Sequence, residues 1–125
     1  MAEKILIVEE DHIIHESFIQ GLEGFDTRSA YNGEEAVEIA KNYKPAIVLM
    51  DIHLGNGING INAAAQIQEQ NQDTKIIYIT GDSSKDTLDK IIEKTGNAQV
   101  LYKPTDIKDI EKVIENKSYQ LAKHI

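Results

Sequence analysis

Four short apolar runs in this sequence each end at a side chain that can bind or react with a phosphoryl group. These side chains are Glu9 and Glu10 after residues 5–8, Asp51 after residues 46–50, Thr80 after residues 76–79 and Lys103 after residues 100–102. The carboxyl ends of the strands of an open parallel sheet line one crevice, so the five side chains are expected to meet there. Carboxylates, a hydroxyl and an ammonium group together suit phosphoryl transfer.

The acidic members of this set predict a metal site. Glu9, Glu10 and Asp51 would bring like charges within a few ångströms of one another, which a divalent cation can neutralise. Mg²⁺ takes hard oxygen ligands, keeps several water molecules and needs only one or two protein carboxylates. We therefore expect Mg²⁺, or Mn²⁺ in its place, at this position.

Asp51 differs from the other acids because the most apolar run of the sequence leads to it. Its carboxylate is positioned to attack a phosphoryl donor in line and to become an aspartyl phosphate. Lys103 would offset the charge of the transferred group, and the Thr80 hydroxyl would hydrogen-bond one of its oxygens. Each residue alone has an ordinary structural explanation, and only their joint placement favours the chemistry.

The elements that must position these residues alternate along the chain. Strand-like runs of four to six residues alternate with longer amphipathic patterns, which predicts a doubly wound α/β fold of βαβ units around a buried parallel sheet. Strands are expected at residues 5–8, 26–31, 46–50, 75–79 and 99–102. Helices are expected at residues 12–22, 61–70, 84–94 and 106–122. A further helix is expected to start at residues 32–35 and to end at a break at residues 42–45.

Length and composition limit the class of protein. A chain of 125 residues with 41% hydrophobic content predicts a single domain over residues 1–125. The absence of cysteine excludes disulfides and thiolate metal sites, and no apolar stretch is long enough for a signal peptide or a membrane span. The net charge of −8 disfavours nucleic acid and anionic lipid as direct partners. We expect a cytoplasmic protein without a membrane contact.

Several short motifs carry a resemblance to a known family. They are ILIVEED at residues 5–11, NGEEA at 32–36, IVLMD ending at Asp51, ITG at 79–81 and YKP at 102–104. Over nearly its whole length, the chain resembles the receiver domain of two-component response regulators. The resemblance implies a flavodoxin-like (βα)5 fold with a five-stranded parallel sheet in strand order 2-1-3-4-5 and helices on both faces.

The resemblance also implies a function. A partner histidine kinase or phosphotransfer protein would give a phosphoryl group to Asp51 in the presence of Mg²⁺, and an output domain or downstream protein would respond to the change of conformation. The chain would not be an enzyme beyond catalysing its own phosphorylation and dephosphorylation. Carried over by position, Glu10 is a metal ligand supported by Glu9, His53 offers its backbone carbonyl to the metal, and Thr80 and Lys103 bind the phosphoryl group.

Other positions modify the expected behaviour. His53 and Asp82 stand two residues beyond Asp51 and Thr80, where the family controls the lifetime of the phosphoryl group. Val100 replaces the family's switch aromatic, so the signal is expected to pass instead through backbone shifts in the loop at residues 80–85. The face over residues 88–117 is where the resemblance places partners, including a second copy in a homodimer.

Two alternatives stay open. Glu10 stands where the family usually has aspartate, and Val100 lacks the switch ring. Both features support a degenerate receiver that serves as a docking module without phosphate turnover. A receiver belonging to a hybrid sensor kinase or a multidomain regulator would share the chemistry and differ only in context.

Overall fold

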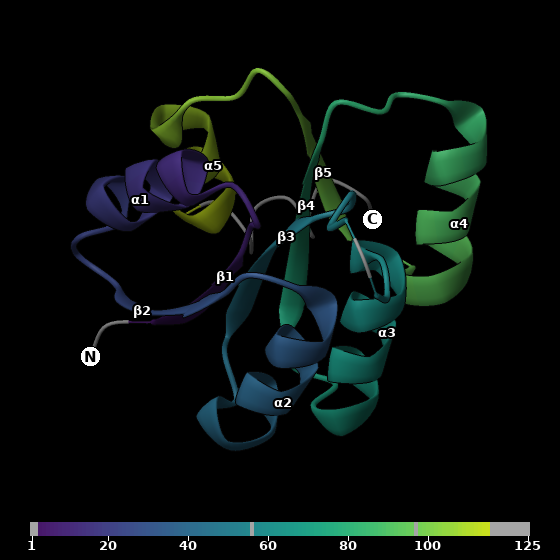
Figure 1. Cartoon of the computed structure of the whole chain (residues 1–125), viewed down its shortest axis with the longest axis horizontal. Coiled ribbons are helices and arrows are strands. Elements are labelled where there is room, and N and C mark those ends of the chain that lie inside the picture. Colours follow the sequence, from purple (N-terminus) through teal and green to yellow (C-terminus); the bar gives the residue numbers. More distant parts are fainter. Residues whose placement is uncertain (1–2, 56, 97, 116–125) are drawn as a thin grey trace.

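A parallel β-sheet forms the centre of the molecule (Figure 1). The computed structural model describes residues 3–55, 57–96 and 98–115. Within these ranges the strands are β1 (Lys4–Val8), β2 (Asp26–Ala30), β3 (Ile47–Asp51), β4 (Lys75–Thr80) and β5 (Gln99–Tyr102). They pair in parallel in the order β2-β1-β3-β4-β5, which confirms the expected strand order.

Helices cover both faces of this sheet because the apolar side chains of its strands alternate between two cores. Ile5 and Ile7 of β1 face the core shared with α1 (His12–Gly21) and α5 (Ile107–Glu115). Leu6 and Val8 face the opposite core, which is covered by α2 (Gly33–Tyr43), α3 (Gly60–Gln70) and α4 (Lys85–Thr95). Figure 1 shows α1 beside α5 on one side of the sheet and the other three helices across it. A strand between two helical layers must be apolar on both faces, as β3 is.

The edge strand β2 has a different character. Its residues alternate between exposed and partly buried, and only Ala30 is fully buried, which explains why its sequence pattern is weak. The guanidinium of Arg28 lies 4.9 Å from the ring centroid of Tyr43 on α2, and the Tyr43 hydroxyl donates a hydrogen bond to the backbone oxygen of Asp26. Side-chain contacts with α2 therefore hold this edge in addition to the pairing with β1.

β3 and β4 each end one residue later than the sequence predicts, and this places two site residues on the sheet. β3 and β4 include Asp51 and Thr80 as their last residues, so both side chains stand on the sheet itself and not in the loops that follow. Strand pairing therefore fixes their backbones: Asp51 pairs with Ile79, and Thr80 pairs with Tyr102.

Polar caps begin the helices directly after the strands. The Asp11 carboxylate accepts hydrogen bonds from the backbone N–H groups of Ile13 and Ile14 at the start of α1. Asn32, Asn59 and Ser84 cap α2, α3 and α4 in the same way. α4 ends at Thr95, and Gly96 follows as its C-cap with a φ of +65°. The expected continuation of α5 to residue 122 lies outside the described residues.

Among the helices that the structure describes, none combines the length and the apolar character that crossing a bilayer requires.

Candidate functional site

Three of the five predicted side chains, those of Glu9, Asp51 and Lys103, meet at the carboxyl ends of the strands, and Thr80 ends the neighbouring strand β4. Glu9, Asp51 and Thr80 are buried there, with exposed fractions of 2%, 6% and 1%. The Nζ atom of Lys103 lies 3.6 Å from Oδ2 of Asp51 and 3.7 Å from Oε1 of Glu9. A single ammonium group therefore faces two buried carboxylates.

A backbone hydrogen bond holds Lys103 beside the end of β4. Its N–H group donates a 2.8 Å hydrogen bond to the backbone oxygen of Thr80, which continues the pairing of β4 and β5 by one residue. The peptide bond from Lys103 to Pro104 is cis. The Lys103 side chain stays about one-third exposed, so a ligand bound at Asp51 would contact both the amine and solvent.

The electrostatics of the site centre on Glu9. Burial raises the pKa of Glu9 to about 7, and the nearby charge of Asp51 acts in the same direction. The N–H group of Asp11, which donates to Oε2 of Glu9 over 3.0 Å, and the charge of Lys103 both oppose this rise in pKa. Oε1 of Glu9 is buried and has no hydrogen-bond donor among the described residues. The carboxylate pair is therefore short of positive charge.

These oxygens suit a hard cation. Mg²⁺ needs only one or two protein carboxylates and completes its shell with water, and Glu9 and Asp51 supply two inward-facing carboxylates. In the described ranges, no three His, Cys, Asp or Glu side chains gather in a geometry that could hold a metal ion. The fit therefore rests on the oxygens of Glu9 and Asp51.

Glu10 is the predicted residue that does not join the cluster directly. Its side chain is exposed and lies against Gly55, where a Cβ atom would come within 2.6 Å of its Oε2 atom. Gly55 has a φ of +68°, a conformation that side chains rarely adopt. The Glu10 carboxylate thus rests on the loop that follows Asp51.

The two residues predicted to influence phosphoryl lifetime face each other. Nε2 of His53 lies 3.7 Å from Oδ2 of Asp82, while the backbone N–H of His53 donates to Oδ1 of Asp51 over 3.1 Å. The backbone N–H of Asp82 donates to the Thr80 hydroxyl over 3.0 Å. His53 and Asp82 are therefore each bonded to a site residue and span the space beside Asp51.

Asp82 also contacts α4. Thr87 Oγ1 donates to Oδ2 of Asp82 over 2.6 Å, and the backbone N–H of Ser84 donates to Oδ1 over 2.9 Å. Mainly through the Thr87 hydrogen bond, the pKa of Asp82 is lowered to about 2. Asp82 is thus a charged link between the site and the start of α4.

Val100 lies beside a tyrosine that the sequence reasoning did not single out. Val100 pairs in register with Tyr78, whose ring is fully buried and whose hydroxyl lies 2.9 Å from Oγ1 of Thr95 on α4. Burial raises the pKa of Tyr78 to about 12, so the phenol stays protonated. An aromatic side chain therefore lies on β4, next to the place where the family carries one on β5.

His15 is buried, although the sequence favoured an exposed histidine on an acidic helix. It is 1% exposed, its Nδ1 atom lies 2.8 Å from the backbone oxygen of Glu9, and its ring stacks on Tyr31. Its spacing from Phe18 and Leu22 places it on the inner face of α1, and this spacing was the available signal.

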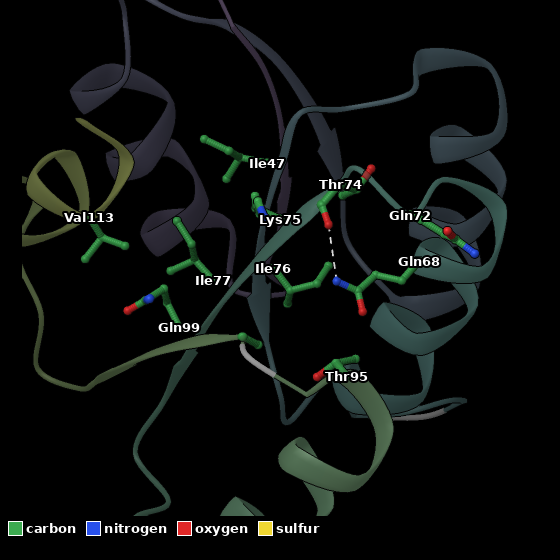
Figure 2. Close-up of a pocket in the computed structure, with 11 residues that line it drawn as sticks. Ile47, Gln68, Gln72, Thr74, Lys75, Ile76, Ile77, Thr95, Gln99 and Val113 are labelled. Atoms are coloured by element: carbon green, nitrogen blue, oxygen red, sulfur yellow. Dashed lines mark hydrogen bonds between the residues drawn. The ribbon is translucent and has the colours of Figure 1, made fainter. Parts of the chain in front are cut away.

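A separate pocket of about 150 Å³ lies at the other end of the sheet (Figure 2). It includes Ile47, Lys75 and Gln99, the first residues of β3, β4 and β5, whereas the candidate site lies at the carboxyl ends of these strands. Glutamine and threonine side chains line much of the rest, and Gln68 donates a hydrogen bond to the backbone oxygen of Thr74. None of the predicted site residues lines this pocket.

Comparison with known proteins agrees with this geometry. The family described as response regulator receiver domain matches residues 5–115. The transcriptional regulatory protein PdtaR of Mycobacterium tuberculosis is 31% identical over 115 residues, which is 90% of this chain and 55% of that protein. The chain spans about half the length of the curated relatives that it matches first.

Two solved structures show the same fold. A response regulator receiver domain protein (CheY-like) from Methanospirillum hungatei aligns over 100% of both chains with a TM-score of 0.87 at 24% identity. A response regulator from Burkholderia pseudomallei, described with a phosphorylated aspartic acid, a calcium ion and citrate, aligns over 98% of this chain and 72% of that one. Its TM-score is 0.82 at 25% identity. From the family match and the strand order that carries the acidic site, we conclude that the chain belongs to the response regulator receiver domain family.

Proposed function

We propose that the chain accepts a phosphoryl group on Asp51 from the phosphohistidine of a kinase or phosphotransfer protein and passes the signal to an output partner. The observation that carries the proposal is the position of Lys103, whose amine lies within 3.7 Å of both the Asp51 and Glu9 carboxylates. A buried nucleophile beside a cation is what an in-line phosphoryl transfer requires.

The reaction follows from the placement of these groups. A carboxylate oxygen of Asp51 attacks phosphorus, the bond from phosphorus to the donor's nitrogen breaks, and the bonding electrons leave with the imidazole. Lys103 offsets the negative charge on the phosphoryl oxygens, and the Thr80 hydroxyl can donate to one of them while its oxygen still accepts from Asp82. A bound Mg²⁺, held by Asp51 and Glu9 with Glu10 and the His53 carbonyl as further ligands, would supply additional positive charge. The chain would catalyse only its own phosphorylation and dephosphorylation.

A structural neighbour supports this assignment. The Burkholderia pseudomallei response regulator described above carries a phosphorylated aspartic acid and a calcium ion. Its similarity to this chain supports an aspartyl phosphate at Asp51 as a chemical state of the protein. The proposal includes a cytoplasmic location, where a kinase has access to ATP.

Phosphorylation would change the conformation near α4. A phosphoryl group adds a charge of about −1.5 to −2, which attracts Lys103 and the Thr80 hydroxyl. Thr80 is bonded to Asp82, and Asp82 is bonded to Thr87 on α4. A movement of Thr80 would therefore reach α4, on the face over residues 88–117 where we place the output partner or a second copy. Residues 97, 116 and 117 of this face lie outside the described residues.

Labelling with a small phosphoryl donor tests the proposal. Acetyl phosphate with Mg²⁺ is expected to add one phosphoryl group, measured by intact mass, and beryllofluoride is expected to shift the amide resonances of residues 80–88. Asp51→Asn should abolish both responses, while Asp89→Asn, an exposed aspartate on α4, should keep them. Unchanged labelling of Asp51→Asn would contradict the proposal.

The second candidate is a docking module that does not turn over phosphate. It is favoured by Glu10, whose carboxylate lies against Gly55. This candidate predicts that Mg²⁺ and acetyl phosphate leave the chain unlabelled while partner binding is the same for the wild type and Asp51→Asn.

A further inference from the structure

We propose that Glu34 is a positioning residue that clamps the loop following Asp51 and thereby sets the affinity of the site for a divalent cation. This inference rests on the proposed function. The acceptor loop is defined here as residues 52–55 and 57–59, between β3 and α3. Glu34 lies in the first turn of α2, outside the group of residues that the sequence predicts for the site.

Glu34 makes a direct contact with the far part of the acceptor loop. The backbone N–H of Ile58 donates a 2.8 Å hydrogen bond to Oε2 of Glu34. The same carboxylate lies against Gly57, where a Cβ atom would come within 2.5 Å of Oε1 and 2.6 Å of Oε2. Gly57 has a φ of +93°, so both its backbone conformation and the carboxylate above it require glycine.

Gly33 completes the contact from the neighbouring position. A Cβ atom at Gly33 would lie 2.6 Å from Cγ1 and 2.8 Å from the backbone oxygen of Ile58. The start of α2 therefore touches Ile58 at its N–H group, its carbonyl and its side chain. This is a close fit between two segments that are 24 residues apart in the sequence.

The near part of the acceptor loop is bound to Asp51. The N–H of Gly60 donates to the backbone oxygen of Ile52 over 2.9 Å, and a Cβ atom at Gly60 would lie 2.1 Å from the backbone oxygen of Asp51. His53 donates its N–H to Oδ1 of Asp51. Ile52 and Leu54 anchor the loop because they are buried, so a displacement at Ile58 can reach Asp51 and His53 through Gly60 and Ile52.

The cation-binding groups depend on this loop at three points. The loop begins at Asp51, it carries the His53 carbonyl, and it supports the Glu10 carboxylate at Gly55. Groups that orient metal ligands without touching the metal commonly change its affinity by about 10- to 100-fold when they are removed. Glu34 is placed to act in this way.

Five variants separate the clamp from effects of charge and backbone strain. Glu34→Ala removes the hydrogen bond and the charge, whereas Glu34→Gln removes the charge and keeps an oxygen that can accept from Ile58. Glu38→Ala removes a charge from the same helix at a residue whose side chain is exposed and pairs with Lys41. Gly96→Ala is the strain control for Gly57→Ala, because Gly96 has a φ of +65° and nothing within 4 Å of an added Cβ.

The measurement is a Mg²⁺ titration followed by amide chemical shifts, together with hydrogen exchange of the Ile58 amide without metal. We expect Glu34→Ala and Gly57→Ala to raise the Mg²⁺ Kd about tenfold and to speed exchange at Ile58. Glu34→Gln, Glu38→Ala and Gly96→Ala should stay within about threefold of wild type. At saturating Mg²⁺, Glu34→Ala should be labelled by acetyl phosphate at the wild-type rate, because Asp51, Thr80 and Lys103 are unchanged.

The outcomes distinguish the clamp from the proposed function. If the wild type is labelled and Glu34→Ala matches Glu38→Ala in Mg²⁺ affinity and Ile58 exchange, the clamp is wrong and the function stands. If the wild type binds Mg²⁺ but is never labelled, the proposed function fails. The Mg²⁺ Kd values of the variants then still show whether Glu34 sets the affinity of the site. A wild type that does not bind Mg²⁺ would overturn the clamp as a determinant of affinity.

Discussion

Thr87 and Asp82 join the first turn of α4 to the end of β4 through a 2.6 Å hydrogen bond between Oγ1 and Oδ2. Asp82 in turn donates its backbone N–H to the Thr80 hydroxyl. Among the residues of α4, only Ile91 is fully buried, so polar contacts hold a large share of this helix in place. Asp82 therefore connects Thr80, which we propose to bind the phosphoryl group, with the proposed output face.

Replacing Thr87 by valine should break this connection while keeping the shape of the side chain. The pKa of Asp82 is expected to rise from about 2 toward its ordinary value of 3.8, because the Thr87 hydrogen bond is the largest cause of its depression. Amide exchange in the first turn of α4 should become faster, and the shifts that beryllofluoride causes in α4 should become smaller. Thr87→Ser, which keeps the hydroxyl, is the control. A Thr87→Val protein with the wild-type Asp82 titration by NMR would contradict the assignment.

Glu9 predicts a pH dependence of stability near neutrality. Its pKa is 4.5 in the unfolded chain and about 7 in the fold, so between these values the folded state holds a proton that the unfolded state has released. The free energy of unfolding should therefore fall as the pH rises through this window, by about 2–3 kcal/mol at most. Urea unfolding at a series of pH values, with chelator present, measures this slope.

Glu9→Gln removes this titration. The variant should show a flatter stability profile from pH 5 to 8 and should be more stable than wild type at pH 8 without divalent cations. Added Mg²⁺ should stabilise wild type more than the variant, because the cation offsets the buried charge. Equal slopes for the two proteins would show that another group controls stability in this range.

Gly60 should not tolerate alanine. A Cβ atom there would lie 2.1 Å from the backbone oxygen of Asp51 and 2.8 Å from Cα of Ile52, both of which are parts of the backbone and cannot rotate away. We expect Gly60→Ala to lower the free energy of unfolding by about 3 kcal/mol or more and to slow labelling of Asp51. At Gly24, nothing lies within 4 Å of an added Cβ, so Gly24→Ala should change stability by less than about 1 kcal/mol. Equal denaturation midpoints for the two variants would refute the steric argument.

Lys103→Met should separate transfer chemistry from folding. Removing the ammonium group takes away the charge nearest Asp51, so labelling by acetyl phosphate should slow by about 100-fold or more. The pKa of Glu9 should rise further, because Lys103 lowers it in the wild type. Lys85→Met, which removes the same charge from an exposed pair with Asp89, should keep the wild-type rate. Rapid labelling of Lys103→Met would exclude a direct role for the amine.

The apolar runs of the sequence were sufficient to predict the alternation of strands and helices and the approach of Lys103 to Asp51, whereas the strand order came from the family resemblance. The runs have clear boundaries, and the carboxyl ends of parallel strands lie at one edge regardless of the details of the loops. β2 was the weakest strand prediction because an edge strand is only partly buried and lacks a continuous apolar pattern.

Local features of the site could not be predicted in the same way. The Glu10 side chain lies against Gly55, whose φ is positive, and the contact between Glu34 and Ile58 joins the first turn of α2 to a loop that is 24 residues away. Neither contact leaves a periodic pattern, because one contact with an irregular loop places no demand on neighbouring residues. The burial of His15 was not predicted although its spacing from Phe18 and Leu22 marks the inner face of α1, because a histidine on an acidic helix is most often exposed.

Because α4 buries few of its side chains, its outer surface is under weak structural constraint during evolution. Leu88 and Ile92 are 40% and 58% exposed, while Ile91 alone is fully buried among the residues of the helix. Mutations on the outward side of α4 can therefore accumulate without threatening the fold or the reaction at Asp51. After gene duplication, one copy can acquire a new output partner while both copies keep the same proposed reaction at Asp51.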